Sequence, residues 1–337
     1  MEKEFFVSII IPIYNGEKYV LKCLKQLLNQ KFTDFEVIFI DDNSKDNSEN
    51  VIKQFLESKI EYIYIKQREN HGVAYSKNLG IRLARGKYIM FHDQDDWMES
   101  DCLVTLYEYA KETNADRITG AYREIDDKGN ILREVHYDKG FSKWFCTALH
   151  GVIFRREVFI NYQLSIPAST LMEDAYVNCM FTQYAKKCVY IEKIIFNYLI
   201  REDSSSGAKT TNEKYNSINL FQSALECFVP LYKSLDNDED RADIEYMVVK
   251  QFFWYLLHNN RYSSYKQILM DYKKLQGMIK KEFPNYKRNI RITLFKQNGD
   301  RISGRRRTYI IMLVHKLGFM KLFLWMYQKL SKVKYLT

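Results

Sequence analysis

The chain has 337 residues, 46% of them hydrophobic and 28% charged, which is a globular composition and excludes disordered and fibrous proteins. Its net charge of +9 is uneven, because residues 1–200 carry 26 basic against 29 acidic residues whereas residues 201–337 carry 25 against 13. Such a basic C-terminal part requires a solvated surface or an anionic partner such as nucleic acid, anionic lipid or a phosphorylated substrate.

Strand-like and helix-like patterns alternate over the first 100 residues. Buried-strand runs lie at 7–11, 35–40, 60–65 and 88–91. Helical patterns lie at 17–30, from Ser44 onward, and at 74–85 with Gly86 as the predicted C-cap. The order is β-α-β-α-β-α-β, which is typical of a mostly parallel sheet with helices on both faces.

Polar or acidic clusters follow all four predicted strands. They read PIYNGE at 12–17, DDNSKD at 41–46, QRENHG at 67–72 and HDQDD at 92–96. In parallel sheets of this kind, ligands bind beyond the carboxyl ends of the strands. We therefore expect the four loops to form one site at one edge of the sheet.

The patterns beyond residue 120 are mixed. Gly129 is predicted to form a hairpin turn, residues 144–160 and 171–187 to form further packed elements, and residues 190–200 to form a strand. The sequence SSSG at 204–207 indicates a loop. We therefore expect one domain at 1–207 and a helical, basic domain at 208–337.

The last 30 residues are strongly apolar and aromatic, but His315, Lys316 and Lys321 interrupt them. No stretch reaches the roughly 18 uncharged apolar residues of a membrane-spanning helix. Two interpretations stay open: a helix packed in the C-terminal domain, or one lying on a membrane surface. The basic run at 305–307 suits anionic lipid.

The N-terminus MEKEFFVSIIIP lacks the basic start of a secretory signal, so we expect a cytoplasmic protein.

Three aspartates, Asp93, Asp95 and Asp96, follow the fourth predicted strand. Carboxylates so close together repel one another, and a divalent cation relieves that repulsion. An Asp-x-Asp turn offers hard oxygen ligands to Mg²⁺ or Mn²⁺ and leaves positions for phosphate oxygens. The competing interpretation is a solvated loop before a helix starting near Met98, and we assign Asp96 to that helix.

Asp41 and Asp42 stand at the end of the second predicted strand. A carboxylate there is able to accept the imide N–H of uracil or to hold a ribose hydroxyl. The alternative interpretation is a charge at the N-terminus of the following helix.

The segments VSIIIPIYNGEKYV, VIFIDDNSKDNS and ENHGVAYSKNLGIRLARGKYIMFHDQDD, in this order and spacing, resemble the inverting glycosyltransferase family 2. The resemblance covers roughly residues 5–200 and implies the GT-A (nucleotide-diphospho-sugar transferase) fold, a Rossmann-like sheet. It implies that Asp42 binds the base and that Asp93 and Asp95 form the metal-binding D-x-D, Asp95 being the surer ligand of Mn²⁺ or Mg²⁺. The other residues that it places at the nucleotide-sugar site are Pro12, Tyr14, Glu17 and Gln94.

Members of this family usually carry a late Glu-Asp pair, which STLMEDAYVNCMF supplies as Glu173 and Asp174. The resemblance implies that Asp174 is the base that takes the proton from an acceptor hydroxyl as it attacks the anomeric carbon. Lys77 stands where the family often has arginine, which implies a phosphate or ribose contact. Arg201 is expected to contact the pyrophosphate.

The implied activity is metal-dependent transfer of a sugar, with inversion, from a nucleotide-diphosphate donor, a UDP-sugar being favoured, to a glycan or lipid-linked glycan hydroxyl. The expected place is the cytoplasm, with peripheral contact to the inner face of the cell membrane.

One alternative is a catalytically silent nucleotide-sugar-binding protein. Another is a sugar-nucleotide nucleotidyltransferase, although PIYNGEKYV lacks its Gly-rich basic loop. No recognised nucleic-acid-binding module surrounds the basic tail, so we expect no nucleic acid partner. The resemblance makes 1–207 the catalytic domain, and we expect 208–337 to serve acceptor binding, oligomerisation or membrane contact. The sequence leaves the oligomeric state open.

Overall fold

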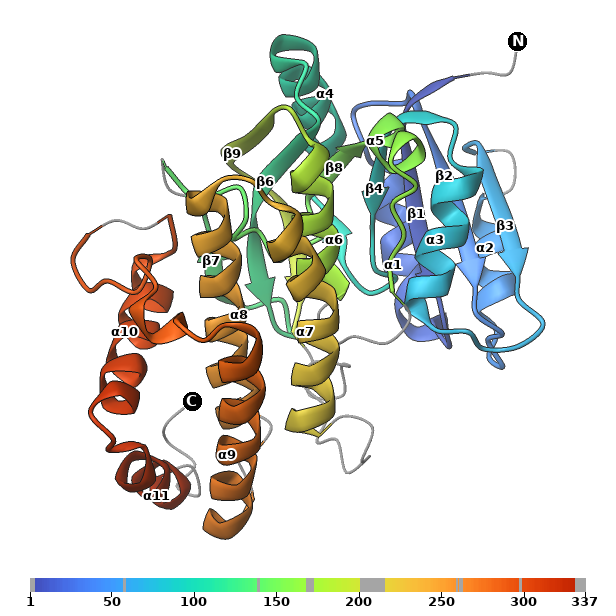
Figure 1. The fold of residues 1–337 in the computed structure, drawn as a ribbon. Helices are drawn as coiled ribbons and strands as arrows, with labels where there is room; N and C mark the ends of the chain where they lie inside the picture. Colours follow the sequence, from blue (N-terminus) through green and yellow to red (C-terminus); the bar gives the residue numbers. More distant parts are fainter. Residues whose placement is uncertain are drawn as a thin grey trace. The chain divides into compact units, whose positions relative to one another are not determined.

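The computed structural model describes residues 4–56, 59–137, 140–167, 173–200, 216–258, 260, 263–296 and 299–330. These residues form two compact units (Figure 1). The first comprises the described residues within Met1–Tyr137, Thr147–Ala168 and Glu173–Ala208, and the second those within Asp138–Cys146, Ser169–Met172 and Lys209–Thr337. The predicted domain boundary at 207–208 lies outside the described residues.

The first unit is built on a nine-stranded mixed sheet with the strand order β3-β2-β1-β4-β8-β6-β9-β5, and β7 pairs with β6. The strands are β1 Phe5–Ile13, β2 Phe35–Asp41, β3 Tyr62–Lys66, β4 Gly86–Phe91, β5 Trp97–Met98, β6 Arg117–Ile125, β7 Ile131–Val135, β8 Val152–Arg155 and β9 Cys188–Leu199. The helices of this unit are α1 Glu17–Leu28, α2 Ser48–Leu56, α3 Val73–Leu83, α4 Cys102–Thr113, α5 Arg156–Asn161 and α6 Glu173–Tyr184.

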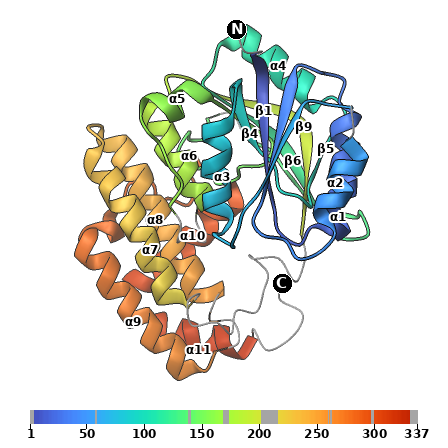
Figure 2. The same cartoon turned by 90° about the vertical axis from the view of Figure 1, so that its right-hand side faces the viewer.

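The first half of the sheet confirms the predicted alternation of strands and helices. Strands β3, β2, β1 and β4 are parallel neighbours. Figure 2 shows α3 on one face of these strands and α1 and α2 on the other. The second half is mixed, because β8 is antiparallel to β4 and β6 whereas β9 is parallel to β6. The carboxyl ends of the four parallel strands therefore share one edge, as the sequence predicts.

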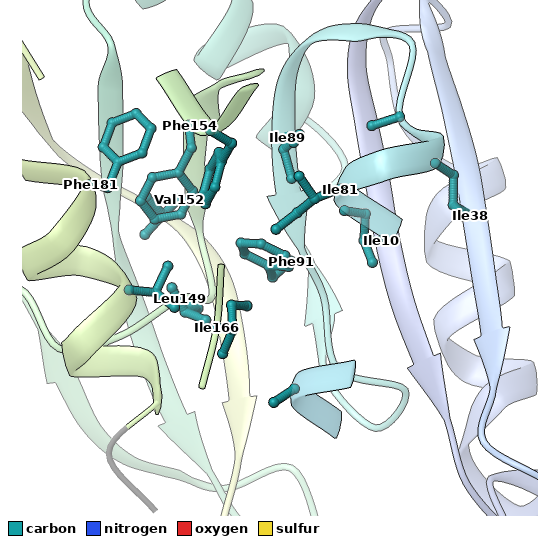
Figure 3. Packing of buried hydrophobic residues seen from close by; sticks show 14 of the residues in the cluster. Ile10, Ile38, Ile81, Ile89, Phe91, Leu149, Val152, Phe154, Ile166 and Phe181 are labelled. Atoms are coloured by element: carbon teal, nitrogen blue, oxygen red, sulfur yellow. The ribbon is translucent and has the colours of Figure 1, made fainter. Parts of the chain in front are cut away.

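A hydrophobic cluster joins the sheet to α3 and α6 (Figure 3). Ile10 of β1 and Ile89 of β4 lie beside Ile81 of α3, and all three are buried. The rings of Phe154 and Phe181 meet edge to face at 4.9 Å. Helix α3 lies directly on β1, since a Cβ atom at Gly80 would come within 2.3 Å of the Ile10 side chain. This packing fixes the position of α3, whose N-terminal end lies at the loop edge of the sheet.

Three of the predicted local boundaries are wrong, each because of a tertiary contact. Helix α2 starts at Ser48, since the Ser44 hydroxyl accepts the N–H of Asn15 from the neighbouring loop. Gly86 starts β4 and does not cap α3, and a Cβ there would lie 2.5 Å from the backbone N of Ser8. The helix expected near Met98 begins at Cys102. The hairpin turn at Gly129 is confirmed, with φ +84°.

The second unit is helical, as predicted. Its helices are α7 Ser217–Ser234, α8 Asp238–His258, α9 Tyr265–Glu282, the 3₁₀ turn η2 Tyr286–Arg288, α10 Ile302–Lys316 and α11 Met320–Leu330. The segment 140–146 packs with these helices, because the Trp144 indole N–H donates to Asp240 (2.6 Å) and the Ser142 hydroxyl to Asp243 (2.7 Å). Within the described ranges, no helix has the length and apolarity that crossing a membrane requires.

His315 of α10 is buried between two tyrosines of the second unit. Its Nδ1 lies 2.8 Å from the Tyr272 hydroxyl, and its Nε2 is hydrogen-bonded to the Tyr286 hydroxyl. Burial, with a smaller contribution from the positive charge of Lys287, lowers the pKa of His315 to about 4. The imidazole is therefore neutral at physiological pH and joins α9, η2 and α10.

We predict that His315→Gln changes how the stability of the protein depends on pH. The folded pKa of His315 lies below its ordinary value of 6.5, so the unfolded chain binds the proton more tightly. Wild type should therefore lose about 3 kcal/mol relative to the variant as the pH falls from 6.5 to 4. Urea unfolding at both pH values measures this difference.

Asp243 contributes the opposite dependence of stability on pH over a similar pH range, because burial raises its pKa to about 6. Wild type and His315→Gln share this contribution, so it cancels when the two are compared. The matched control is His136→Gln, since the side chain of His136 is 47% exposed. Parallel pH profiles of wild type and His315→Gln would contradict the prediction.

Candidate active site

The loops that follow β1 and β2 are interlocked by hydrogen bonds. Three N–H groups of the first loop donate to side chains of the second at 2.9–3.0 Å: Asn15 to Ser44, Gly16 to Ser48, and Glu17 to Asp46. In return, the Glu17 carboxylate accepts the N–H of Asn47 (3.1 Å). Glu17, predicted at the nucleotide pocket, therefore also fixes the geometry of these two loops.

The loop after β4 is attached to the loop after β1 by one side chain. The Oε1 atom of Gln94 accepts the N–H of Tyr14 (3.0 Å), and its Nε2 donates to the Tyr14 carbonyl (3.0 Å). A Cβ atom at Gly16 would come within 2.3 Å of Gln94 Oε1, so a larger residue there would displace the Gln94 side chain. The Tyr14 side chain is 51% exposed at this edge. Pro12 is partly buried, past the last β1–β4 pair Ile10↔Phe91.

Asp42 ties the end of β2 to the loop before α3. Its carboxylate accepts the N–H of His71 at Oδ1 (2.8 Å) and the N–H of Gly72 at Oδ2 (2.7 Å). The residue is 3% exposed. A carboxylate has about four lone-pair sites, so these two bonds leave acceptor capacity for a nucleotide. Asp42 therefore has a structural role in addition to the predicted base contact.

The aspartates after β4 differ in their surroundings. Asp93 and Asp95 are partly buried, whereas Asp96 is 1% exposed and accepts the N–H of Leu199 from β9 (2.9 Å). Our assignment of Asp96 to the following helix is thus wrong, because its partner belongs to the sheet. In the described ranges, no three His, Cys, Asp or Glu side chains gather as a metal site. Asp93 and Asp95 supply two oxygen donors, which suffice for Mg²⁺ or Mn²⁺ only with water and substrate oxygens.

A buried ion pair joins α3 to the start of α6. Lys77 Nζ lies 2.9 Å from Glu173 Oε1 and 3.4 Å from Asp174 Oδ1. The side chains of Lys77, Glu173 and Asp174 are 4%, 15% and 44% exposed, respectively. Lys77 is thus enclosed, whereas Asp174 opens to solvent.

The charges of this cluster influence one another. Burial by itself lowers the pKa of Lys77, but the negative charges of Asp174, Glu173 and Asp93 outweigh it, and the pKa is raised above its ordinary value. The pKa of Glu173 is raised, chiefly by burial. The positive charge of Lys77 opposes this shift, and the negative charge of Asp174 adds to it. Asp93 contributes to both shifts, so the loop after β4 lies within electrostatic reach of the α3–α6 ion pair.

Amide side chains fix the two helices that carry the ion pair. The Asn178 amide donates to the carbonyl of Ala148 (3.0 Å) and to that of Asp174 (2.9 Å), which anchors the first turn of α6. The Asn78 amide exchanges two hydrogen bonds of 2.8 Å with the backbone of Ile166. Asp174 is therefore held at a defined position.

The structure brings Lys77, Asp93, Glu173 and Asp174 together, and joins Tyr14 to Gln94. The pairing of Lys77 with Glu173 was not predicted. One signal indicates it: Lys77 lies between Ala74 and Ile81 on the buried stripe of α3, and a buried cation requires an anionic partner. The phosphate or ribose contact of Lys77 stays a prediction. Arg201 lies outside the described residues.

Residues 8–165 match the profile of the family described as "Glycosyl transferase family 2". The chain is 29% identical over 220 residues to glycosyltransferase GlyA of Streptococcus pneumoniae, which covers 59% of this chain and 31% of GlyA. It is 27% identical over 257 residues to the poly(ribitol-phosphate) beta-N-acetylglucosaminyltransferase TarP of Staphylococcus aureus. That match covers 71% of this chain and 76% of TarP. The chain spans 31–42% of the length of the first three curated relatives.

The fold resembles that of S. aureus TarS residues 1–349. The structure of this TarS fragment with UDP-GlcNAc matches with a TM-score of 0.72 at 15% identity, and the match covers 93% of this chain and 92% of the fragment. The structure with UDP matches with a TM-score of 0.69. These likenesses confirm the GT-A fold that the sequence predicts.

We predict that Lys77→Met lowers the free energy of unfolding by about 3 kcal/mol, because it leaves two carboxylates together without a buried cation. The matched control is Lys53→Met, which removes the exposed Lys53–Glu49 pair (2.7 Å) and should cost less than about 1 kcal/mol. Chemical denaturation of both variants measures the difference. A similar small loss in both would show that the Lys77 ion pair does not hold α3 to α6.

Proposed function

Because the match over residues 8–165 makes this chain a member of glycosyltransferase family 2, we propose that it transfers a sugar from a nucleotide-diphosphate donor, with inversion, to a hydroxyl of a glycan or lipid-linked glycan. We propose a UDP-sugar as the donor. Two findings support this choice: the fold resembles that of TarS, whose structures hold UDP and UDP-GlcNAc, and TarP is named as an N-acetylglucosaminyltransferase.

The observation that carries the proposal is the difference between Glu173 and Asp174. Glu173 is enclosed and engaged by Lys77 at 2.9 Å, whereas the Asp174 carboxylate is 44% exposed. A general base must reach the proton that it takes, so the exposed carboxylate suits the role. We assign Asp174 as the base that takes the proton of the attacking acceptor hydroxyl. Lys77 and Glu173 are positioning residues, since they hold the start of α6 against α3.

Asp93 and Asp95 would hold a divalent cation, Mn²⁺ or Mg²⁺. Their donor set fits, because two hard carboxylate oxygens on a tight turn leave positions for water and pyrophosphate oxygens. When bound, the cation supplies positive charge that stabilises the departing nucleotide diphosphate. The partly buried position of both side chains and the electrostatic reach of Asp93 to the Lys77 cluster support this assignment.

The donor nucleotide would lie along the loops after β1, β2 and β4. The exposed Tyr14 ring offers a flat apolar face to a base, and Gln94 fixes the backbone of Tyr14. Asp42 retains acceptor capacity toward the base, and Pro12 and Glu17 border the same loops. These contacts would orient the donor, with its anomeric carbon facing Asp174 in the first turn of α6.

We predict that Asp174→Asn lowers the rate of UDP release from a UDP-sugar with acceptor by about 10²-fold or more, because the amide cannot accept the acceptor proton. Binding of UDP, measured by calorimetry, should stay at the wild-type level. The matched control is Asp127→Asn, an exposed carboxylate in the turn between β6 and β7, which should leave both measurements unchanged. Wild-type turnover by Asp174→Asn would refute the assignment of the base.

We predict that UDP raises the melting temperature strongly only when Mn²⁺ is present. At a UDP concentration of about 100 Kd, the stabilisation should approach 2.7 kcal/mol. EDTA, or the variant Asp95→Ala, should remove most of it, whereas Asp127→Asn should retain it. If UDP stabilised the EDTA-treated wild type as well as the Mn²⁺-loaded protein, the metal assignment would be wrong.

If wild type bound a UDP-sugar but released no UDP with any acceptor, the chain would be a silent nucleotide-sugar-binding protein.

A further inference from the structure

Helices α10 and α11, and the turn that joins them, carry large apolar side chains that face solvent. The exposed fractions of these residues are 41–61%. They are Ile302, Ile310, Leu313, Leu317, Phe319, Leu322, Trp325, Met326 and Leu330, and we call them the α10–α11 surface. So many neighbouring exposed apolar residues are unusual for a soluble surface and mark an interaction site.

This surface exists because both helices have two apolar stripes. On α11, Met320 and Leu324 are buried, whereas Leu322, Trp325 and Met326 point to solvent. On α10, Ile311 and Met312 are buried and Ile310 and Leu313 are exposed. The inner stripes pack toward α8 and α9. Figure 1 shows α10 and α11 on the side of α8 and α9 away from α7, so the outer stripes are not covered by the other helices of the unit.

Along this segment of the sequence, basic residues alternate with the apolar ones, and acidic residues are absent. Residues 301–330 contain seven Lys or Arg and no Asp or Glu. The exposed cations among them are Arg306, Arg307, Lys316, Lys321 and Lys329. The preceding acid, Asp300, is buried and bound to Lys250 (2.8 Å). The surface therefore combines exposed apolar side chains with exposed cations.

We propose that the α10–α11 surface docks on an anionic lipid bilayer. Leucine, phenylalanine and tryptophan side chains would enter the boundary between head groups and acyl chains, and the interleaved cations would meet the lipid phosphates. A second copy of the chain fits less well, since a symmetric contact would place these cations against one another. Nucleic acid fits less well too, because a phosphate backbone would leave the aliphatic side chains uncovered. The proposal concerns only the second unit and does not depend on the catalytic assignment.

The test is flotation of the full chain with phosphatidylcholine vesicles, with and without phosphatidylglycerol. Wild type should float with the anionic vesicles, and the bound fraction should fall as salt is added. The double variant Lys321→Gln/Lys329→Gln should weaken binding roughly 30-fold, since each cation contributes about a factor of five near an anionic surface. Its control, Lys111→Gln/Lys128→Gln, removes the same charge from exposed positions of the first unit and should bind like wild type.

The apolar contribution needs its own pair of variants. Trp325→Ala should weaken binding by about tenfold or more, because it removes a large side chain from the lipid boundary. The matched control is Trp254→Ala on α8, whose side chain is similarly exposed, at 43% against 48%. Circular dichroism and UDP binding confirm that each variant is folded.

Equal flotation of Trp325→Ala and wild type, or equal binding to neutral and anionic vesicles, would overturn the proposal. So would sedimentation showing a wild-type dimer that Leu322→Glu converts to a monomer, because the occupant would then be a second copy.

Discussion

The arrangement of the candidate site depends on one interaction, the ion pair of the buried Lys77 ammonium with Glu173 and Asp174. It connects α3, which packs on β1 and β2, to the first turn of α6, almost a hundred residues later in the chain. An isolated buried cation is strongly unfavourable, so this position of α3 is stable only while Glu173 and Asp174 lie beside it. The same contact holds two mutually repelling carboxylates together. The carboxylate that remains partly exposed is thereby presented at a fixed point.

The acidic residues at the loop edge divide into two groups by what their oxygens contact. Asp42, Asp46 and Asp96 accept backbone N–H groups from other segments, and these bonds determine the loop conformations. Asp93, Asp95 and Asp174 are more exposed than Asp42 and Asp96. A fold that gathers many carboxylates at one edge stabilises most of them with its own N–H donors. The more exposed carboxylates are the ones suited to a cation or a proton.

The sequence predicted the elements of the first half of the sheet well, because buried parallel strands appear as continuous apolar runs and their loops as polar clusters. The errors occurred where a partner distant in sequence determines a residue's role. Ser44 resembles a helix cap locally, but its hydroxyl is occupied by Asn15. Asp96 resembles a helix start, but β9 holds it. The Lys77–Glu173 pair was missed for the same reason, since no local pattern shows that α3 and α6 meet.

The C-terminal helices show why an apolar sequence alone could not distinguish a packed helix from one on a membrane surface. Each helix has a buried stripe, as the packed interpretation expects, and also an exposed apolar stripe, on which the membrane proposal rests. Met320 and Leu324 lie one turn apart on the buried side of α11, and Leu322 and Trp325 lie on the opposite side. The inner stripe packs within the unit, whereas the outer stripe faces solvent. Its apolar side chains therefore need another explanation, and the absence of acidic residues around them is the feature that favours an anionic lipid surface.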